Sequence, residues 1–599
     1  MKFQKKYIFI FLLVFFSIAL STYLWPIIKF PLTRNDIFGI YLINNHSPLN
    51  DVARYIVFIF IPFSVFLITK LILFKIPFSQ FMQSFKSKPE NIVLDKKLNY
   101  LSYFFFLYLI FEFISLSFPL HTIDIYHDGQ KMSSAYKSLL DDSLWTGSYV
   151  TVGIIYETIG SKLIWQLFNN VSIGLVRFLD FIYIFITKTL LVLLLYEISK
   201  TVNFKTKYKL IFFFIITISC MSLISYNSYD ADNIHFREIP ILISLIFFIK
   251  SLNKISIFYN IIFGFLSVFV FIWSIDRGIV FLIFLILFCI FLIFNKRYRV
   301  TFNIIASIIF FWTIFYFIQI DEFFYFLNNT YSVLTEIMYI GGLIHPTPFF
   351  DGENSSRATK SILVILFSLI FSINYLLNTK LKYQNNFKFV LLFLSIICFL
   401  SYTYALGRSD GPHIKQSFAF PSIFLIITIF YFLVAFVSDL KIKYFENSKF
   451  FISIPFITLI ILIGFKSNFT HVLNYKDRLA NYISLSDEKF LNENDKIFVE
   501  TASNILRNEK CIQLFTNDAA LLYLLRKPSC TKFYFFYSIG SPKNQLDLVN
   551  NLNSKNYLIV NGTTDKWSPQ ISERYPILNE TIQKYTNEII VGDRIIKFK

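Results

Sequence analysis

The stretch "YLSYFFFLYLIFEFISLSFPLHTIDIYHDGQ", residues 100–130, decides the fold of this chain. Residues 100–118 are almost entirely apolar, and about 20 such residues in a helix cross the ~30 Å of hydrocarbon in a bilayer. Asp124, His127 and Asp128 follow shortly after. The stretch therefore predicts a membrane-spanning helix that leads, at the membrane surface, into a cluster of ionisable side chains.

Apolar runs of this kind recur along the 599 residues, of which 55% are hydrophobic and only 16% are charged. A soluble domain does not repeat runs of membrane-spanning length. The first run has a basic start, but no small-residue cleavage site follows it, so we expect an uncleaved span. The pattern predicts a polytopic α-helical membrane protein with about thirteen spans, at 7–28, 52–74, 100–118, 174–197, 209–226, 238–251, 255–274, 278–295, 301–319, 361–379, 388–406, 417–438 and 450–466.

The net charge of +18 predicts how the chain is oriented in the membrane, because the basic residues lie in particular loops. Their distribution does not favour a nucleic-acid partner. Lys and Arg are concentrated in short loops such as 75–99, 198–209 and 439–449, which is typical of cytoplasmic loops. With a cytoplasmic N-terminus, alternating spans put the long loops 119–173 and 320–360 outside. We therefore expect a multi-pass protein of a bacterial inner or plasma membrane whose chemistry takes place on the extracytoplasmic face.

Three parts follow from this layout. Residues 1–99 would hold two spans and a basic cytoplasmic loop, and residues 100–466 a catalytic membrane module with the outer loop 119–173. Residues 467–599 would form a small soluble extracytoplasmic α/β domain, with short apolar segments that read as strands at 495–500, 511–517, 556–562 and 588–598, and helices at 519–526 and 545–553.

Two of the five cysteines, Cys511 and Cys530, lie in this last part, and the other three lie in predicted spans. An extracytoplasmic pair is exposed to an oxidising compartment, which favours a disulfide. The alternative is a pair of buried thiols.

Beyond Asp128, the outer loop holds two amphipathic segments, "QKMSSAYKSLL" (130–140) and "YETIGSKLIWQLF" (156–168). We expect Gly129 to break the chain and the two helices to lie in the membrane interface, framing a carboxylate. Partial desolvation raises the pKa of such a carboxylate and suits a general base acting on a hydroxyl or amine. Asp128 is the candidate base and Asp124 the second choice. The alternative is a solvated loop whose acids only end a helix.

The order of an acidic residue after a span, an interfacial helix, a Trp/Tyr turn and a second interfacial helix resembles the first outer loop of the GT-C superfamily. These are polytopic glycosyltransferases that take sugars from polyprenyl-phosphate carriers. The resemblance is best over 119–200, and it implies that Asp128 serves as the base or orients the acceptor. In the family this loop usually follows the first span, whereas here it follows the third, which two extra N-terminal spans would explain.

A second polar cluster, "YALGRSDGPHIKQSF" (404–418), lies between two predicted spans, where Gly407, Gly411 and Pro412 favour a tight outer turn. Arginine grips a phosphate with two parallel hydrogen bonds, so this turn predicts a phosphate site. The alternative is a turn of ordinary interfacial anchors. The predicted substrate-binding residues are Arg408, Asp410, His413 and Lys415, with Asp276 and Arg277 of "WSIDRGIVF" (273–281) and with His127 and Glu157 of the outer loop. Asp276 and Arg277 would otherwise only pair with each other.

Weaker candidates lie in two further loops. Residues 226–240 hold Asp230, Asp232, His235, Arg237 and Glu238, which allow a divalent-metal site or a solvated loop. The loop 341–360 is a candidate lid and carries His345, Asp351 and Arg357. Within spans, Glu112, Asp180 and Lys188 should face the bundle, because a lipid-facing charge is costly.

These features predict a glycosyltransferase that moves a sugar from a polyprenyl-phosphate donor to a glycan, lipid or protein acceptor, with inversion at the anomeric carbon. The sequence requires no cofactor, and it allows a divalent metal ion at the site. No Walker A loop or GxGxxG motif is present. A transporter or flippase of lipid-linked glycans is the first alternative, although it would more often show broken helices in paired halves. A polysaccharide polymerase or ligase is the second.

Overall fold

The computed structural model describes residues 2–30, 48–86, 95–226, 234–254, 256–336, 344–350, 352–378, 386–439, 450–466, 469–553, 557–561 and 575–599. A helix lies at every one of the thirteen predicted spans. These helices are α1 (Lys2–Leu24), α2 (Pro48–Leu73), α4 (Lys96–Ile114), α7 (Ile173–Thr201), α8 (Thr206–Met221), α9 (Ile239–Asn253), α10 (Ile257–Trp273), α11 (Ile275–Phe294), α12 (Tyr298–Ile318), α15 (Ser355–Leu377), α16 (Phe387–Ser401), α19 (Ala419–Asp439) and α21 (Phe450–Lys466).

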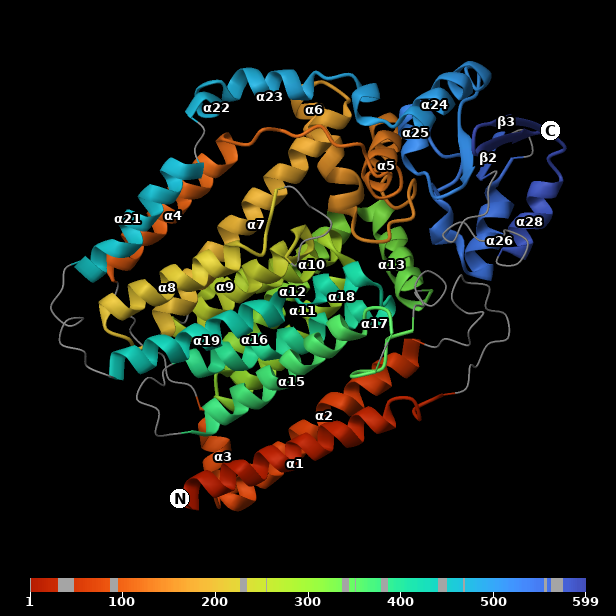
Figure 1. The fold of residues 1–599 in the computed structure, drawn as a ribbon. Helices are drawn as coiled ribbons and strands as arrows, with labels where there is room; N and C mark the ends of the chain where they lie inside the picture. The colour runs from red at the N-terminus through yellow and green to blue at the C-terminus, as the bar shows by residue number, and fades with distance from the viewer. Residues whose placement is uncertain are drawn as a thin grey trace.

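Nine helices in the described ranges are long and apolar enough to cross a membrane, so the protein is a multi-pass membrane protein. The others, α8, α9, α10 and α21, are shorter, and the count of thirteen spans stays a prediction. The helices run side by side as a bundle, with α1 and α2 paired along one edge (Figure 1). Shorter helices around the bundle are α3 (Phe78–Ser84), α13 (Ile320–Thr335), α17 (Thr403–Gly407), α18 (Gly411–Ser417), α22 (Phe469–Leu473) and α23 (Tyr475–Ile483).

The ionisable residues of the spans face the bundle, as predicted. The Lys188 ammonium pairs with Glu112 at 2.9 Å, from α7 to α4. Asp180 lies two turns earlier on α7 and accepts hydrogen bonds from Lys131 of the outer loop at 2.9 and 3.0 Å. All three side chains are buried or nearly so, because hydrocarbon offers an exposed charge no hydrogen bonds.

The outer loop folds into α5 (His127–Asp141), a π-helical turn η2 (Ile155–Ile159) and α6 (Gly160–Phe168), so both amphipathic helices are confirmed. The expectation that Gly129 breaks the chain is wrong. Gly129 lies inside α5, and a Cβ atom there would come 2.1 Å from the backbone nitrogen of Ala520. Glycine at this position allows the close approach of α25 (Ala520–Leu524).

The apolar side of α5 is covered by protein. Met132 and Ala135 are buried in a cluster that also holds Trp165, Ala520 and Tyr523. The Ser133 hydroxyl donates to the Ala519 carbonyl at 2.5 Å. The predicted placement of this face against the bilayer is therefore corrected, because the C-terminal segment packs there instead.

The C-terminal segment forms a four-stranded sheet in the order β1-β2-β4-β3, with β1 parallel to β2 and the other pairs antiparallel. The strands are β1 (Ile512–Phe515), β2 (Tyr557–Asn561), β3 (Asn587–Val591) and β4 (Arg594–Phe598), and the longer flanking helices are α24 (Glu493–Ile505), α26 (Pro542–Asn551) and α28 (Pro576–Gln583). Short 3-10 turns are η3 (Phe236–Glu238), η4 (Asp487–Phe490) and η5 (Phe536–Ile539).

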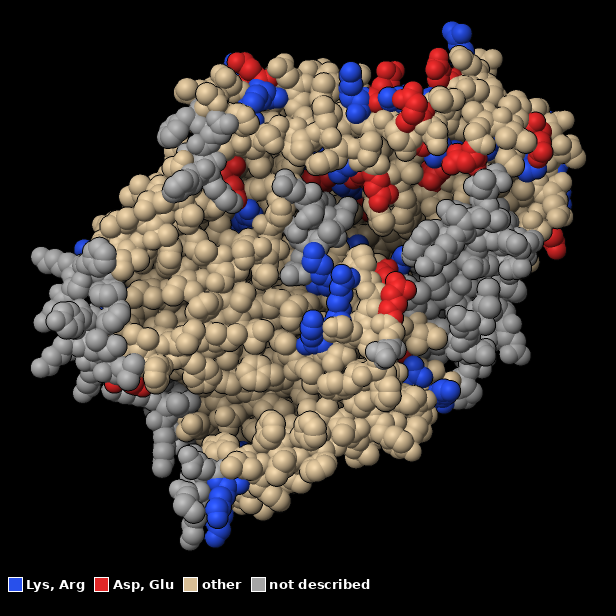
Figure 2. Space-filling view, viewed as in Figure 1, with Lys and Arg blue, Asp and Glu red and all other residues tan. Residues whose placement is uncertain are grey.

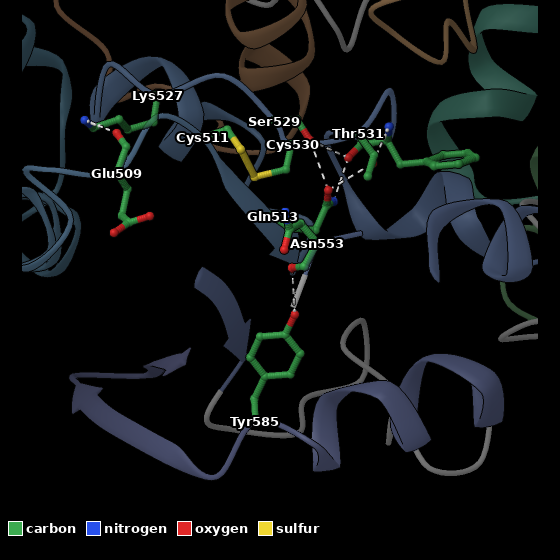
Figure 3. The surroundings of a disulfide bond; sticks show 10 residues. Glu509, Cys511, Gln513, Lys527, Ser529, Cys530, Thr531, Asn553 and Tyr585 are labelled. Atoms are coloured by element: carbon green, nitrogen blue, oxygen red, sulfur yellow. Dashed lines mark hydrogen bonds between the residues drawn. A yellow bond between two sulfur atoms is a disulfide. The ribbon is translucent and has the colours of Figure 1, made fainter. Parts of the chain in front are cut away.

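Two details of this segment bear on the sequence predictions. The disulfide is confirmed, because Cys511 is bonded to Cys530 beside β1 (Figure 3). The strand predicted at 495–500 is wrong, because these residues lie in α24. Asn492 caps this helix by accepting from the backbone N–H of Asp495, and Phe498 and Ala502, one helical turn apart, are both buried.

Candidate functional site

Asp128, in the first turn of α5, is the centre of a closed ion-pair network. Its carboxylate lies 3.1 Å from the Lys131 ammonium and 2.8 Å from the Arg177 guanidinium. Lys131 is shared with Asp180. Burial raises the pKa of Asp128, but the two cations outweigh it and hold the pKa below its ordinary value. The side chain is only 3% exposed, so this carboxylate is charged and enclosed.

Asp128 also fixes the backbone of Asp124, whose N–H donates to it at 2.9 Å. The Asp124 side chain is 48% exposed and lies 2.6 Å from Nδ1 of His127, which is also exposed. Burial raises the pKa of Asp124, but the hydrogen bonds from His127 and Tyr126 lower it to about 2. The accessible acid–imidazole couple of the loop is therefore Asp124 with His127, and Asp128 lies behind it.

Glu157 is fully buried beneath the same loop. It accepts hydrogen bonds from the backbone N–H of Thr151 at 3.0 Å and of Val152 at 2.5 Å, and from the Tyr534 hydroxyl at 2.6 Å. Burial raises its pKa. Glu157 thus connects the outer loop to the C-terminal segment. The prediction that Glu157 contacts a substrate has no support from its position, because none of its atoms is exposed.

Three polar clusters that lie far apart in the sequence meet around the ring of Tyr404. The guanidinium carbons of Arg237 and Arg277 lie 5.0 and 5.2 Å from the ring centroid. The imidazole of His413 lies against the same ring, with centroids 4.8 Å apart. Asp410 and Arg408 adjoin His413, and we call the set Arg237, Arg277, Tyr404, Arg408, Asp410 and His413 the arginine cluster.

Arg277 is held by carboxylates on two sides. Its Nε donates to Glu238 at 3.0 Å, and Nη1 donates to Asp276 at 2.8 Å. Asp276 also accepts a short hydrogen bond from the Ser274 hydroxyl. Arg277 is 1% exposed, whereas Asp276 is 31% exposed. The predicted Asp276–Arg277 pair exists, and the same two residues also face the other polar groups around Tyr404.

Arg237 differs from Arg277, because among the described residues it has no carboxylate within ion-pair distance. Its Nε atom is buried and has no hydrogen-bond partner there. The Arg237 side chain lies over Tyr404, and the aromatic face offers only a weak interaction. Asp276 attracts the Arg237 guanidinium from beyond ion-pair distance but already pairs directly with Arg277. A buried guanidinium without a direct carboxylate contact has room for an incoming anion, and this position therefore favours one.

The 404–418 turn consists of the two short helices α17 and α18 around Asp410. Asp410 accepts from the backbone N–H of His413 at 2.9 Å and lies 2.5 Å from its Nδ1. Nε of Arg408 lies 2.7 Å from the other Asp410 oxygen. Burial raises the pKa of Asp410, but the His413 and Arg408 contacts lower it overall. Figure 2 shows Lys and Arg side chains gathered near α18, the helix that carries Lys415.

The weaker candidates are spread over two places. His235 caps η3 and is buried near the arginine cluster, where burial and the charges of Arg237 and Arg277 keep its pKa well below the ordinary value. Nη1 of Arg357 would lie 2.5 Å from a Cβ atom at Gly411, so α15 adds another cation to the 404–418 turn. Asp230, Asp232 and Asp351 lie outside the described residues.

His345 belongs to a separate buried network. Its backbone N–H donates to Asp51 of α2 at 2.8 Å, and its Nε2 lies 2.8 Å from the Tyr402 hydroxyl. Burial lowers the pKa of His345 to about 4. The network links α2 to Tyr402, the residue that precedes α17, so His345 helps to hold the 404–418 turn in place.

No group of three or more possible metal ligands occurs in the part of the chain that the structure describes. The residues that sequence reasoning missed are Tyr404, Lys131 and Arg177. Lys131 follows Asp128 at helical i,i+3 spacing, which is a signal for an ion pair. The role of Tyr404 has no sequence signal, because Arg237 and Arg277 lie 167 and 127 residues before it in the chain.

Comparisons with known proteins give similar solved structures. No family model and no curated protein matches the chain. ArnT from Cupriavidus metallidurans bound to undecaprenyl phosphate is 9% identical, covers 83% of this chain and 98% of its own, and has a TM-score of 0.44. Archaeal oligosaccharyltransferase AglB from Archaeoglobus fulgidus, in complex with an inhibitory peptide and a dolichol-phosphate, is 10% identical. The match covers 77% of this chain and 69% of AglB, with a TM-score of 0.41.

The Archaeoglobus fulgidus oligosaccharyltransferase in complex with Zn and sulfate is 12% identical, covers 76% of this chain and 68% of its own, and has a TM-score of 0.41. Identities this low and scores below 0.5 assign no residue of this chain a role. Its chemistry has to be inferred from its own side chains.

Proposed function

We propose that the protein is an inverting glycosyltransferase that moves a sugar from a polyprenyl-phosphate donor to an acceptor in cell-envelope glycan or glycolipid assembly. The observation that carries this proposal is the arginine cluster, in which the buried Nε atom of Arg237 has no hydrogen-bond partner among the described residues. The cluster lies at the ends of apolar helices, where the phosphate of a membrane-embedded lipid would be found. The acceptor would be a glycan, a lipid or a protein.

Arg237 and Arg408 would hold the donor phosphate, with Lys415 of α18 nearby. A guanidinium forms two parallel hydrogen bonds to a phosphate, and it keeps its charge at any physiological pH. Arg277 is already neutralised by Glu238 and Asp276, so its part is to hold Tyr404 and the neighbouring backbone in place. Asp410 and His413 would orient Arg408.

In the transfer step, an acceptor hydroxyl oxygen forms a bond to the anomeric carbon, and the bond from that carbon to the phosphate oxygen breaks. The polyprenyl phosphate leaves with the electron pair, and inversion follows from the single displacement. The Asp124–His127 couple would take the acceptor proton, because it is the exposed acid–imidazole pair of the loop. Asp128 would act as a positioning residue through the backbone of Asp124.

Donor binding tests the arginine cluster directly. Purified full-length protein is titrated with undecaprenyl phosphate, and binding is followed by native mass spectrometry. Arg237→Ala should weaken binding roughly ten- to hundred-fold, since a hydrogen bond to a charged group contributes about 1.5–3 kcal/mol. Arg237→Lys should restore part of it.

The matched control is Arg297→Ala, at the opposite end of α11 from Arg277. It should bind undecaprenyl phosphate as the wild type does. Equal loss in both alanine variants, or no loss in Arg237→Ala, would show that the arginine cluster does not hold the phosphate.

The two rival functions make different products. A flippase moves a lipid-linked glycan across a liposome membrane and leaves every glycosidic bond intact. A polymerase or ligase transfers a whole glycan chain. Incubation of the purified protein with radiolabelled polyprenyl-phosphate sugars and a cell-envelope extract distinguishes the three, because only the proposed enzyme transfers single sugars and releases polyprenyl phosphate.

The domain roles and the orientation belong to the same proposal. Residues 100–466 would form the catalytic module, residues 1–99 an N-terminal addition that supports the 404–418 turn through Asp51 and His345, and residues 467–599 an extracytoplasmic domain that covers the outer loop. The transfer would take place on the extracytoplasmic face, as the distribution of Lys and Arg between the loops indicates.

A further inference from the structure

A cavity of about 720 Å³ lies between α4, α7, α8, α21 and α22. None of its lining residues belongs to the arginine cluster or to the Asp128 network. A volume of this size is in the usual range for small-molecule sites. The cavity therefore has the size of a ligand site and no role in the transfer described above.

The charges inside this cavity cancel. The Lys188 ammonium of α7 pairs with Glu112 of α4 at 2.9 Å, and both residues line the cavity. The same ammonium lies 4.3 Å from the ring centroid of Tyr226. Ionisable side chains within membrane helices are retained where they face a polar path or guest. An added anion or cation would compete with the existing ion pair, so an uncharged guest fits better.

Hydroxyl groups and the His471 imidazole are the other polar side chains of the lining. Ser115, Tyr108, Ser222 and Tyr226 all line the cavity. The Ser115 hydroxyl and the Tyr226 hydroxyl are buried and have no hydrogen-bond partner within the described ranges. Buried polar groups are nearly always hydrogen-bonded, so these two hydroxyls favour a ligand that can both donate and accept hydrogen bonds. A polyhydroxyl group does both.

One wall of the cavity is apolar and adjoins the lipid. Leu462 of α21 lines the cavity, and Ile457, Ile460 and Ile461 of the same helix are exposed on the outside of the bundle. In Figure 1, α21 lies beside α4 at the edge of the molecule. A guest whose apolar part follows α21 into the lipid would leave its polar part beside Lys188 and Glu112.

We propose that this cavity binds the headgroup of a membrane glycolipid, an uncharged polyhydroxyl group on a lipid tail. Hydroxyls of the sugar would pair with Ser115, Tyr226 and the outer atoms of the Lys188–Glu112 pair, and the tyrosine rings would cover its apolar face. The site goes beyond the proposed transferase function, and its occupancy needs no donor at the arginine cluster.

Photolabelling tests the site without turnover. Full-length protein is placed in phosphatidylcholine nanodiscs that carry one of three diacyl lipids with the same diazirine acyl chain and a glucosyl, a phosphoglycerol or a phosphocholine headgroup. After irradiation, mass spectrometry measures labelled peptides from α4, α8 and α21. The glucosyl lipid should label them about fivefold more than either phospholipid.

Two variants locate the label. Ser222→Trp fills the cavity and should abolish the excess, whereas Ile286→Trp, on the lipid-exposed side of α11, should leave it unchanged. The double variant Glu112→Gln/Lys188→Met removes both charges together, so no unpaired ion remains, and should reduce the excess severalfold. Unchanged undecaprenyl phosphate binding by all variants shows that they are folded and separates this site from the donor site.

Equal labelling by the three lipids would mean that the cavity accepts any lipid. Stronger labelling by the phosphoglycerol lipid would make it an anion site. An excess that survives Ser222→Trp would place the glycolipid elsewhere. Each of these three results overturns the proposal.

Discussion

Replacement of Asp128 by asparagine should destabilise the protein strongly, because this carboxylate neutralises two buried or partly buried cations. Lys131 lies 3.1 Å and Arg177 2.8 Å from it. Removal of one partner of a buried ion pair costs about 3–5 kcal/mol. Asp180 still pairs with Lys131, and Arg177 is partly exposed, so we expect the lower end, about 3 kcal/mol. That is roughly a hundred-fold change in the unfolding equilibrium.

Asp124→Asn is the matched control. The Asp124–His127 pair is about half exposed, and an exposed ion pair contributes only about 0.2–1 kcal/mol. This variant should remain folded and lose turnover by roughly a hundred-fold or more if the couple takes the acceptor proton. Asp128→Asn combined with Arg177→Gln should recover part of the stability that Asp128→Asn loses, because the uncompensated cation is gone.

The assay is unfolding in mixed micelles with rising SDS, followed by tryptophan fluorescence, alongside initial rates of sugar transfer. The contrary result is that Asp128→Asn unfolds at the same SDS fraction as the wild type while its turnover rate falls about a hundred-fold. That result would identify Asp128 as the base and would refute its positioning role. The pH dependence gives a second check. The pKa of folded Asp128 lies below its ordinary 3.8, so its stabilising contribution is complete above about pH 4 and is lost as the pH falls further.

Three further predictions concern the rest of the chain. Replacement of Cys511 and Cys530 by serine should destabilise the C-terminal segment by about 3 kcal/mol, measured by chemical unfolding, because the bond closes a loop of 19 residues; equal stability in reduced and oxidised protein would contradict it. Gly129→Ala should separate α5 from α25 and lower the unfolding midpoint, whereas Gly464→Ala, with no atom within 4 Å of its added Cβ, should not. A reporter that is active only in the cytoplasm should be silent when fused after Lys599, and a strong signal would reverse the orientation.

The sequence predicts well whatever depends on composition within one segment. Hydropathy locates a helix at all thirteen predicted spans, and helical periodicity locates both helices of the outer loop. The inward orientation of Asp180 and Lys188 follows from the cost of a charge in lipid. The same local reasoning fails at 495–500, where a strand-like composition is overridden by the Asn492 cap and the helical spacing of Phe498 and Ala502.

The site is predictable in its residue types and only partly in its arrangement. The arginines and acids of the three outer segments are visible in the sequence, but their meeting around Tyr404 depends on how α11, α17 and η3 pack. The burial of Asp128 likewise depends on Arg177 and Asp180, about 50 residues further along the chain. Periodicity carries no information on contacts at such separations, so the exposed and the enclosed carboxylate could not be distinguished.

The hydrogen bond between Glu157 and Tyr534 joins residues that are 377 positions apart, and Ser133 and Ala519 are 386 apart. At synthesis rates of about 5–20 residues per second, the outer loop would wait roughly 20–75 s for these partners. During that interval Glu157 lacks its hydrogen bond from Tyr534, and α5 lacks the part of its apolar cover that Ala520 and Tyr523 provide. A ribosome stalled before Ala519 would therefore yield a chain whose membrane helices are complete and whose outer loop still lacks its contacts with the C-terminal segment.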